Sequence, residues 1–321
     1  MKAKLTGIGS YVPETILDNK YFEEIIETSD EWIKRRTGIA ERRKVADDQT
    51  TSNISAQAAL NLAEENNIDL KEVDFVIVAT SSYDHVIPNV ASQVCYELGL
   101  KNVGAIDVTA ACAGFGYGIQ VAQGLVMAGN YKKILVIGAE TLTRFTDYTD
   151  RTTCILFGDG AGASIVEAAE ESNILASVSG TDSHLASNLY LANICNNLNG
   201  QDIDPNGYIH QDGKKVFKWA VDTVSTQFKK LVEKAGLEVS DIDWFVPHSA
   251  NMRIVEAVCR NVGFPVEQTL ACLENFGNTS AASVPLALHN GVRNGKVRKG
   301  DKLLLIGFGG GLTFAGSVVE W

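Results

Sequence analysis

The chain has 321 residues, of which 45% are hydrophobic, and this is enough for one large core or two compact lobes. The formal net charge of −11 argues against sequence-independent nucleic-acid binding, because such binding needs lysine and arginine against phosphate. No apolar run approaches the ~20 residues that span a bilayer, and the N-terminus lacks the apolar segment of a signal peptide, so we expect a cytoplasmic protein.

Residues 15–45 are polar and charged, and they contain the run TSDEWIKRRTGIAERR (28–43). The Thr-Ser-Asp sequence at its start can cap a short helix that begins there. Trp32 lies close to Arg36 in this segment. The pair fits either a surface helix with an anchoring tryptophan or a stacking and phosphate-binding edge for a nucleotide-bearing ligand.

Apolar runs and helix-like segments alternate along the first half of the chain. The strand-like runs are continuously apolar, so we expect parallel strands buried in an α/β layer. The expected elements are a helix at 53–66, a strand at 74–80, a helix at 91–98, a strand at 105–108, a helix at 116–127, a strand at 133–139 and a glycine-rich stretch at 158–167.

The second half repeats this order at a constant offset. The run LKEVDF (70–75) is echoed by VSDIDW (239–244). The run KILVIGA (133–139) is echoed by KLLLIGF (302–308), and the distance along the chain is the same for both pairs. Two separated matches at one offset indicate a duplicated α/β unit. The expected halves are residues 1–170 and residues 171–321.

Cys112 lies where the strand at 105–108 gives way to the helix at 116–127. The free N–H groups and the positive dipole end of a helix favour an anion, so we expect this thiol to ionise readily. Taken alone, such a cysteine is more often a small buried residue than a nucleophile. No two of the six cysteines lie within three residues of each other, which excludes a zinc pattern and a redox CxxC.

Two polar residues of the second half are possible partners for Cys112. His248 follows the strand at 244–246, and α/β folds place their sites at the carboxyl ends of parallel strands. Asn278 lies in the small-residue turn ENFGNTSAA (274–282), and its separation from Cys112 is close to the repeat offset. If the halves pack about a pseudo-twofold axis, the two turns face each other. This coincidence favours a catalytic site over three unrelated core residues.

The glycine-rich runs do not predict a dinucleotide site. GDGAGA (158–163) lacks the GxGxxG spacing, and GFGGG (307–311) leads into a strand rather than a helix. A glycine loop beside a nucleophile can instead donate a backbone N–H to an oxyanion.

Further motifs extend from one end of the chain to the other. They are GIGSYVPE (7–14), TSDEWIKRRTGI (28–39), AACAGFGYG (110–118), FGDGAGA (157–163), VPHSAN (246–251), GNTSAAS (277–283) and GFGGGLTFAG (307–316). Together they resemble the β-ketoacyl-acyl carrier protein synthase III family of condensing enzymes. The resemblance implies the α/β thiolase-like fold, in which duplicated βαβαβαββ halves hold central helices sandwiched between sheets.

The resemblance also implies a decarboxylative condensation that initiates fatty acid synthesis. Cys112 would take the acyl group from an acyl-CoA starter, and malonyl-acyl carrier protein would lose carbon dioxide and attack it to give 3-ketoacyl-acyl carrier protein. His248 and Asn278 would donate hydrogen bonds to the malonyl thioester oxygen. Backbone N–H groups of Cys112 and Gly310 would form the oxyanion hole. No metal or further cofactor is implied, since coenzyme A arrives as the substrate thioester.

The same resemblance assigns a coenzyme A site. Trp32 and Arg151 would sandwich the adenine, which favours the nucleotide-binding interpretation of Trp32. Arg36 and Thr37 would contact the phosphate or the base edge, and Asn251 would help to hold the pantetheine arm.

Acyl carrier proteins are acidic, so a basic docking face is expected despite the negative net charge. An ordinary solvated face is the alternative interpretation. The family usually forms homodimers, which we also expect here. The expected docking residues lie on or beside two helices that flank His248, and they are Lys214, Lys215, Lys218, Arg253 and Arg260.

Ile87 stands where a phenylalanine often lines the acyl pocket of the family, so we expect starters that are branched or longer than acetyl. Three alternative functions remain beside this one. They are a related condensing enzyme of specialised, polyketide-like metabolism, a cysteine thioesterase and a non-catalytic binding protein. A thioesterase is disfavoured because no acidic residue obviously orients His248.

Overall fold

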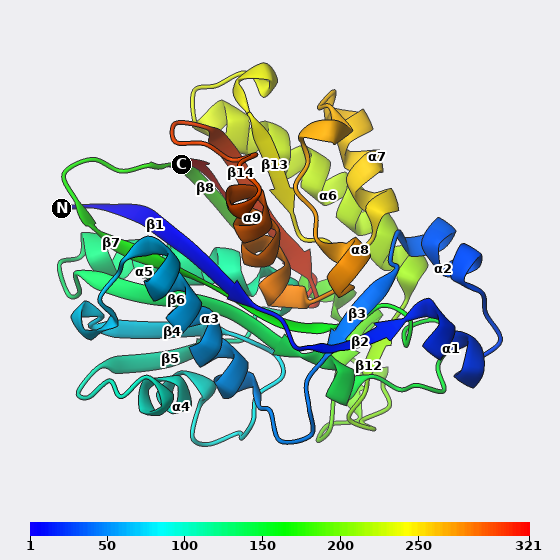
Figure 1. The fold of residues 1–321 in the computed structure, drawn as a ribbon. Coiled ribbons are helices and arrows are strands. Elements are labelled where there is room, and N and C mark those ends of the chain that lie inside the picture. The colour runs from blue at the N-terminus through cyan, green and yellow to red at the C-terminus, as the bar shows by residue number, and fades with distance from the viewer.

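Two largely buried β-sheets form the centre of the computed structural model, which describes residues 1–321 (Figure 1). The first sheet has the order β1 (Lys2–Tyr11), β7 (Asp159–Ala169), β6 (Lys133–Thr141), β4 (Phe75–Ala79) and β5 (Gly104–Val108). β4 is parallel to both neighbours, whereas β7 is antiparallel to both of its own. Every residue of β4 is buried, as its continuous apolar run predicts.

The second sheet has the order β13 (Trp244–Pro247), β14 (Lys302–Gly309), β15 (Thr313–Glu320) and β8 (Ile174–Thr181). β13 and β14 begin at one and the same offset along the chain from β4 and β6, respectively. The expected third strand of this half is reduced to a bridge between Phe245 and Thr269, because the chain then turns into α8 (Leu273–Phe276). The βαβαβαββ order is therefore complete only in the first half.

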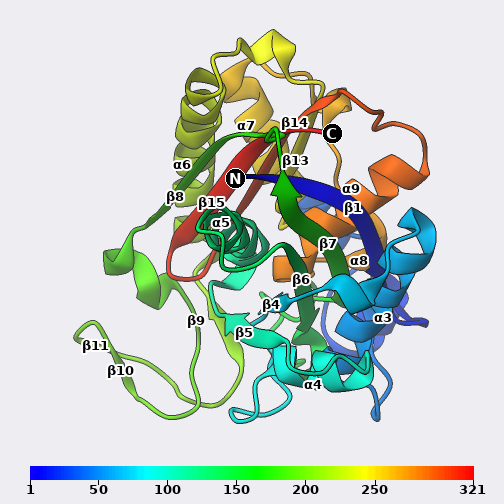
Figure 2. The same cartoon turned by 90° about the vertical axis from the view of Figure 1, so that its left-hand side faces the viewer.

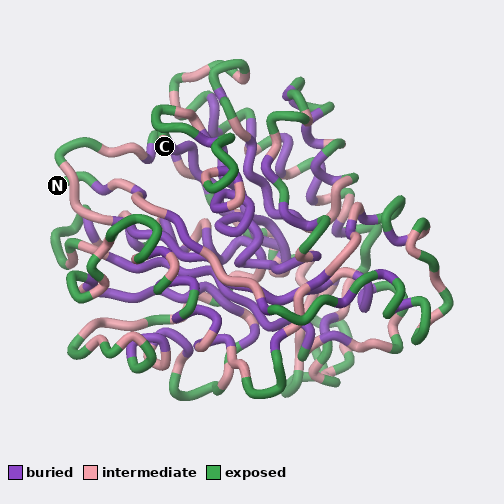
Figure 3. The backbone as a smooth tube through the Cα atoms, in the orientation of Figure 1, coloured by how far each residue is buried: buried purple, intermediate pink, exposed green.

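Helices fill the space between the sheets and cover their outer faces (Figure 2). The two central helices are α5 (Gly114–Met127) and α9 (Ser283–Arg293). The outer helices are α3 (Thr51–Asn66) and α4 (Val90–Glu97) on the first sheet, and α6 (Gly213–Lys234) and α7 (Met252–Val262) on the second. Buried residues are concentrated in the sheets and the helices between them (Figure 3). None of the helices has both the length and the apolar character to cross a bilayer.

A hairpin and two short helices form an arm beside the sheets (Figure 1). They are β2 (Thr15–Asp18), α1 (Asn19–Ile25), α2 (Asp30–Thr37) and β3 (Glu41–Lys44). Ser29 caps α2 by accepting the Trp32 N–H, and Gly38 ends it at φ 84°. Arg42 of β3 is fully buried and donates to the carbonyl of Ile155, which holds the arm against the segment before β7.

A second excursion leaves the sheets between β8 and α6. It contains β9 (Leu189–Leu191), β10 (Asn197–Leu198), β11 (Gln201–Asp202) and β12 (Ile209–Gln211). Single 3-10 turns complete the connections, at η1 (Leu70–Glu72), η3 (Leu142–Phe145), η4 (Ser183–Asn188), η5 (Val239–Asp241) and η6 (Val266–Gln268).

Two further 3-10 turns bring the halves together at the centre, as the sequence predicted. They are η2 (Ala111–Ala113), which precedes α5, and η7 (Ser280–Ala282), which precedes α9. A Cβ on Gly307 of β14 would lie 2.4 Å from the Cys112 carbonyl oxygen. A Cβ on Gly138 of β6 would lie 2.3 Å from the Ala281 carbonyl oxygen. Each turn packs directly on the backbone of the opposite sheet, so both strands need glycine there.

The Gly307→Ala substitution tests this packing. We expect it to lower the free energy of unfolding by at least ~3 kcal/mol, since backbone atoms cannot move away from the new methyl group as a flexible side chain can. Gly124→Ala in α5 is the matched control, because no atom lies within 4 Å of its Cβ position, and it should stabilise by ~0.5–1 kcal/mol. Urea unfolding followed by circular dichroism measures both variants. An unchanged stability of Gly307→Ala would contradict the described contact.

Candidate active site

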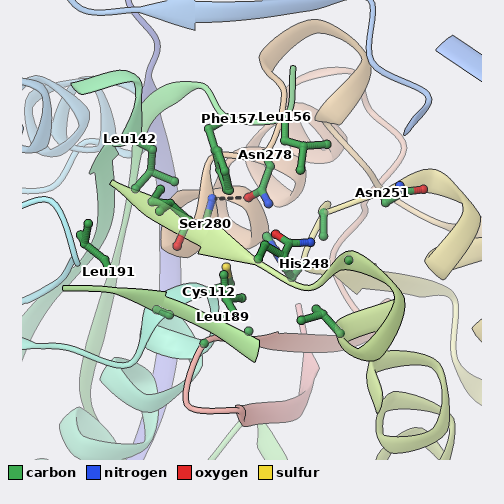
Figure 4. Close-up of a pocket in the computed structure, with 18 of the residues that line it drawn as sticks. Cys112, Leu142, Leu156, Phe157, Leu189, Leu191, His248, Asn251, Asn278 and Ser280 are labelled. Atoms are coloured by element: carbon green, nitrogen blue, oxygen red, sulfur yellow. Dashed lines mark hydrogen bonds between the residues drawn. The ribbon is translucent and has the colours of Figure 1, made fainter. Parts of the chain in front are cut away.

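One cavity of about 1060 Å³ opens beside the two central turns and is lined by residues from both halves of the chain. Cys112, His248 and Asn278 all line it, although they come from η2, the end of β13 and the segment before η7 (Figure 4). The structure therefore brings together the three residues that the sequence singled out.

Cys112 occupies the turn between β5 and α5, which is the position that the sequence predicted. No side chain caps the start of α5, and the N–H of Gly114, its first residue, donates to the Ala111 carbonyl of η2. A Cβ on Gly309 would lie 2.8 Å from the Cys112 sulfur, so glycine is needed at this point of β14. Gly310 follows and lines the same cavity.

The surroundings of Cys112 disfavour ionisation of its thiol. Burial raises its pKa to about 12, while a hydrogen bond with the Ser280 side chain lowers it and the negative charge of Glu140 raises it. Burial therefore shifts this pKa in the direction opposite to the one expected from the helix N-terminus.

His248 is held rigidly at the carboxyl end of β13. Its backbone N–H donates to the Ile306 carbonyl at 2.7 Å, and its Nδ1 lies 2.6 Å from the Ser283 hydroxyl oxygen. Burial lowers its pKa to about 3, so the ring is neutral at ordinary pH. Ser283 begins α9, and its hydroxyl donates to the Ser280 carbonyl at 2.8 Å. When the hydroxyl donates to Nδ1, the ring proton is on Nε2.

Asn278 is fixed by its own backbone and by the turn that follows it. Its N–H donates to the Leu156 carbonyl, and its side-chain oxygen accepts the Ser280 N–H at 2.9 Å. These contacts leave the side-chain nitrogen on the side away from Ser280, facing the cavity (Figure 4). The residue equivalent to Cys112 at the repeat offset is Ala281, so Asn278 precedes the second turn rather than lying within it.

The mouth of the cavity contains all five residues predicted for coenzyme A, which are Trp32, Arg36, Thr37, Arg151 and Asn251. The Arg151 guanidinium lies 4.8 Å from the Trp32 ring centroid, so the two stack directly. An adenine base stacked between the guanidinium and the ring needs a separation of about 7 Å between them, which is twice the van der Waals contact distance. Arg151 is exposed and must swing outward before an adenine can enter.

Two of these side chains already have local partners. The Thr37 hydroxyl donates to the Ile33 carbonyl and accepts the Ile39 N–H, which secures the end of α2. Asn251 caps α7 by accepting the Arg253 N–H, and it donates to the Arg36 carbonyl at 3.1 Å. Asn251 therefore joins α7 to α2 across the mouth of the cavity.

The inner end of the cavity is apolar, with side chains from β9, β12 and the segment before β7 (Figure 4). Its lining includes Leu142, Phe157, Leu189, Leu191 and Ile209. Ile87 is not part of this wall. It is 87% exposed in the loop between β4 and α4 and does not line the cavity of this chain, so its place in an acyl pocket stays a prediction. The sequence could not give the direction of that loop.

The five predicted docking residues are exposed on two helices that pack against each other. Lys214, Lys215 and Lys218 lie on α6, whereas Arg253 and Arg260 lie on α7. Lys214 and Arg253 also line the cavity mouth, and Lys215 pairs with Asp212 at 3.2 Å.

The structure contains no group of three or more His, Cys, Asp or Glu side chains that could hold a metal ion. All six cysteines are free thiols, and Cys195 is the exposed one.

Two family models match the chain. The model described as 3-oxoacyl-[acyl-carrier-protein] synthase III matches residues 106–183, and the model of the C-terminal part of the same family matches residues 232–321. The chain is 50% identical to β-ketoacyl-[acyl-carrier-protein] synthase III 2 of Halalkalibacterium halodurans, over 100% of this chain and 97% of the relative. It is 47% identical to the protein of the same name from Bacillus subtilis, over 100% of this chain and 99% of the relative.

Solved structures show the same similarity. The β-ketoacyl-[acyl-carrier-protein] synthase III of Thermus thermophilus superimposes with a TM-score of 0.96 at 41% identity, over 99% of both chains. The priming β-ketosynthase of the R1128 polyketide biosynthetic pathway superimposes with a TM-score of 0.92 at 36% identity, over 99% of this chain and 96% of the other. The fold predicted from the sequence motifs is thereby confirmed.

The protonation state of Cys112 is directly measurable. Because its pKa is about 12, we expect it to contribute no thiolate absorbance between about pH 6 and 9. An ultraviolet titration of the wild type minus that of Cys112→Ala isolates its contribution from the other thiols. A thiolate step in that range would show that the helix N-terminus outweighs burial after all.

Proposed function

The chain belongs to the 3-oxoacyl-[acyl-carrier-protein] synthase III family, and on this premise we propose how its own residues carry out the reaction. The enzyme condenses an acyl-CoA starter with malonyl-acyl carrier protein, releases carbon dioxide, and gives the 3-ketoacyl-acyl carrier protein that initiates fatty acid synthesis. The observation that carries the proposed site is the meeting of Cys112, His248 and Asn278 in one cavity.

Cys112 takes the acyl group in the first half-reaction. Its sulfur attacks the thioester carbonyl, and coenzyme A leaves. The N–H groups of Cys112 and Gly310 hold the developing oxyanion, and one such donor contributes about 3 kcal/mol of transition-state stabilisation. The close packing of Gly309 on the sulfur supports this assignment, because it brings the next N–H of the glycine loop alongside Cys112.

His248 and Asn278 act in the second half-reaction. Loss of carbon dioxide from the malonyl group places negative charge on its thioester oxygen, and both side chains donate hydrogen bonds to that oxygen. The low pKa of His248 supports a neutral donor rather than a cation. The resulting enolate attacks the acyl group on Cys112. This role needs the ring proton on Nε2, which requires the Ser283 hydroxyl to turn its one proton from the Ser280 carbonyl to Nδ1.

Coenzyme A enters past the arm that carries α2. Arg151 swings off Trp32, and the adenine then stacks between them, while Arg36 lies beside the phosphates. Asn251 and the backbone at Thr37 line the path of the pantetheine arm toward Cys112. The substrates supply the reactive thioester and carboxylate, so the reaction uses no further cofactor.

The acidic carrier protein docks on the basic face of α6 and α7. Lys214 and Arg253 support this placement because they line the mouth through which the malonyl arm must enter. Local charge guides the encounter although the whole chain carries −11.

The active enzyme is a cytoplasmic homodimer in this proposal. β5 is an edge strand of the first sheet, with unpaired backbone groups along one side. Val86, Ile87 and Tyr96 are apolar and at least 76% exposed in the loop and helix that connect β4 with β5. A second copy that pairs at this edge would cover these side chains.

A specialised-metabolite role is the second candidate, because a priming ketosynthase of a polyketide pathway shares 36% identity with the chain. Both roles use the same acyl-cysteine and differ in the carrier protein and the starter. A thioesterase is less well supported, since His248 is paired with a serine and has no carboxylate to orient it as a base.

Intact mass after incubation with acetyl-, isobutyryl- and longer acyl-CoAs tests the nucleophile. We expect a gain of one acyl group that Cys112→Ala abolishes, with branched starters accepted by the apolar wall. Cys195→Ser is the matched control, because it removes an exposed thiol and should acylate like the wild type. Malonyl-acyl carrier protein should then discharge the acyl group as 3-ketoacyl product. Acylation without this discharge would favour the specialised-metabolite role.

The docking face is tested by charge reversal. Lys214→Glu and Arg253→Glu should each raise the KM for malonyl-acyl carrier protein about tenfold, and more at low salt, because they oppose an acidic partner. Lys230→Glu makes the same charge change farther along α6 and is the control. Steady-state kinetics separates the KM values of the two substrates. Equal effects of all three variants would leave general surface charge as the cause.

A further inference from the structure

Glu140, near the end of β6, is a carboxylate with no solvent exposure that the reaction described above does not use. No cationic side chain contributes to its environment, which consists of burial and four hydrogen-bond donors. Removing an unpaired carboxylate from water is costly. A buried carboxylate of this kind is therefore expected either to accept several hydrogen bonds or to take part in the reaction through its negative charge.

The two oxygens of Glu140 differ in their surroundings. Oε2 accepts three hydrogen bonds, from the Ser82 hydroxyl at 2.6 Å, the Ser81 N–H at 3.1 Å and the Thr80 hydroxyl at 3.3 Å. Oε1 accepts only one, from the Ser280 hydroxyl at 3.0 Å. Any proton that Glu140 takes up therefore goes to Oε1, from the direction of Ser280.

Ser280 is the link between Glu140 and the nucleophile. Its hydroxyl donates to Glu140 Oε1, and its side chain lies beside Cys112 on the cavity wall, where it lowers the pKa of the thiol (Figure 4). Its N–H donates to the Asn278 side chain, and its φ of 46° is unusual for a residue with a side chain. The turn thus holds the hydroxyl between sulfur and carboxylate at some cost in backbone strain.

The nucleophile requires a proton acceptor that the established pair does not supply. Burial keeps Cys112 as the thiol, so its proton must leave as the sulfur attacks. His248 is paired with Ser283 at Nδ1, and the proposed mechanism uses its Nε2 as a hydrogen-bond donor. The titratable groups that face one another here are Cys112 and Glu140, because the segment Thr80–Ser82 and the turn η7 contribute only neutral donors to the carboxylate.

We propose that Glu140 accepts the Cys112 proton through Ser280 during acyl transfer. The proton leaves the sulfur for the Ser280 oxygen as the hydroxyl proton passes to Glu140 Oε1, and the sulfur lone pair forms the new bond to the thioester carbon. The bond from that carbon to the coenzyme A sulfur breaks, and the thiolate takes a proton from water. When condensation releases Cys112 as a thiolate, Glu140 returns the stored proton through Ser280. Glu140 thus carries the negative charge while Cys112 is a free thiol, and it is neutral while the acyl group is on Cys112.

This inference rests on the acyl-cysteine of the proposed function, and it makes Glu140 a positioning residue that acts through Ser280. Its raised pKa makes the carboxylate a better base than an exposed one. If the role of Glu140 were purely structural, its substitutions would affect the rate in a different order. The isosteric Gln would then be tolerated better than the shorter Asp, whereas a proton acceptor requires the reverse order.

The test is the rate of acyl-enzyme formation between about pH 6 and 9, measured by rapid quench and intact mass with the preferred acyl-CoA. Wild type should show a shallow pH dependence. Glu140→Gln and Ser280→Ala should be slower by about 10²–10³ at neutral pH and should gain about tenfold per pH unit, because attack then waits for free thiolate. Glu140→Asp should recover part of the rate and the shallow profile.

Asp159→Asn is the matched control. Asp159 is also a fully buried carboxylate that accepts only neutral donors, from Thr143 and Val45, and it has no hydrogen bond to Cys112. It should keep the wild-type pH profile even if it loses stability. Circular dichroism of each variant identifies any that fails to fold, and Ser280→Ala then carries the test, since it leaves Glu140 in place.

The outcomes separate the two levels of the proposal. Failure of the wild type to acylate with any donor would remove the acyl-cysteine mechanism itself. If the wild type acylates while Glu140→Gln keeps its rate and shallow profile, or exceeds Glu140→Asp, the proton relay is wrong and the acyl-cysteine stands.

Discussion

The close crossing of two backbone turns over the opposite sheets is the constraint on which the rest of the structure depends. Gly138 and Gly307 occupy equivalent positions in the duplicated halves. A backbone carbonyl from the turn of the other half packs against each glycine so closely that a Cβ atom would not fit. Because the turns cannot separate without breaking these contacts, the residues on them are positioned by backbone rather than by side-chain packing. Cys112 and Ser280 therefore meet with little freedom.

The same crowding sets the electrostatics of the site. Burial raises the pKa of Cys112 and Glu140 and lowers that of His248, so each shift disfavours charge. A site of this kind binds a neutral thioester without losing much hydration of its own. It then depends on oriented hydrogen-bond donors to stabilise the charge that the reaction creates, which is the arrangement that lowers reorganisation in the transition state.

The sequence allowed prediction of the features that depend on local pattern and on the repeat. Continuous apolar runs located β4, β6, β13 and β14, and the repeat placed Cys112 opposite the segment 274–282, which contains Asn278. The missed residues depend on three-dimensional proximity. Glu140 follows the buried run of β6 at the carboxyl end of a parallel strand, the same signal that located His248, yet its role depends on a serine that lies far away along the chain. Prediction of the Cys112 pKa required knowledge of how deeply the thiol is buried. Prediction of the position of Ile87 required the backbone conformation of its loop.

The turn η7 also limits how many reactions one chain can perform. Ala281 stands in η7 where Cys112 stands in η2, with no functional group at the equivalent position. A duplicated fold with a pseudo-twofold axis offers two places for a nucleophile, but side chains from the second turn already complete the first site. In the proposed mechanism each copy of the duplication has specialised, one as the carrier of the acyl group and the other as the source of polar contacts. That mechanism implies a stoichiometry of one acyl group per chain, with the parts of the site divided between the two halves.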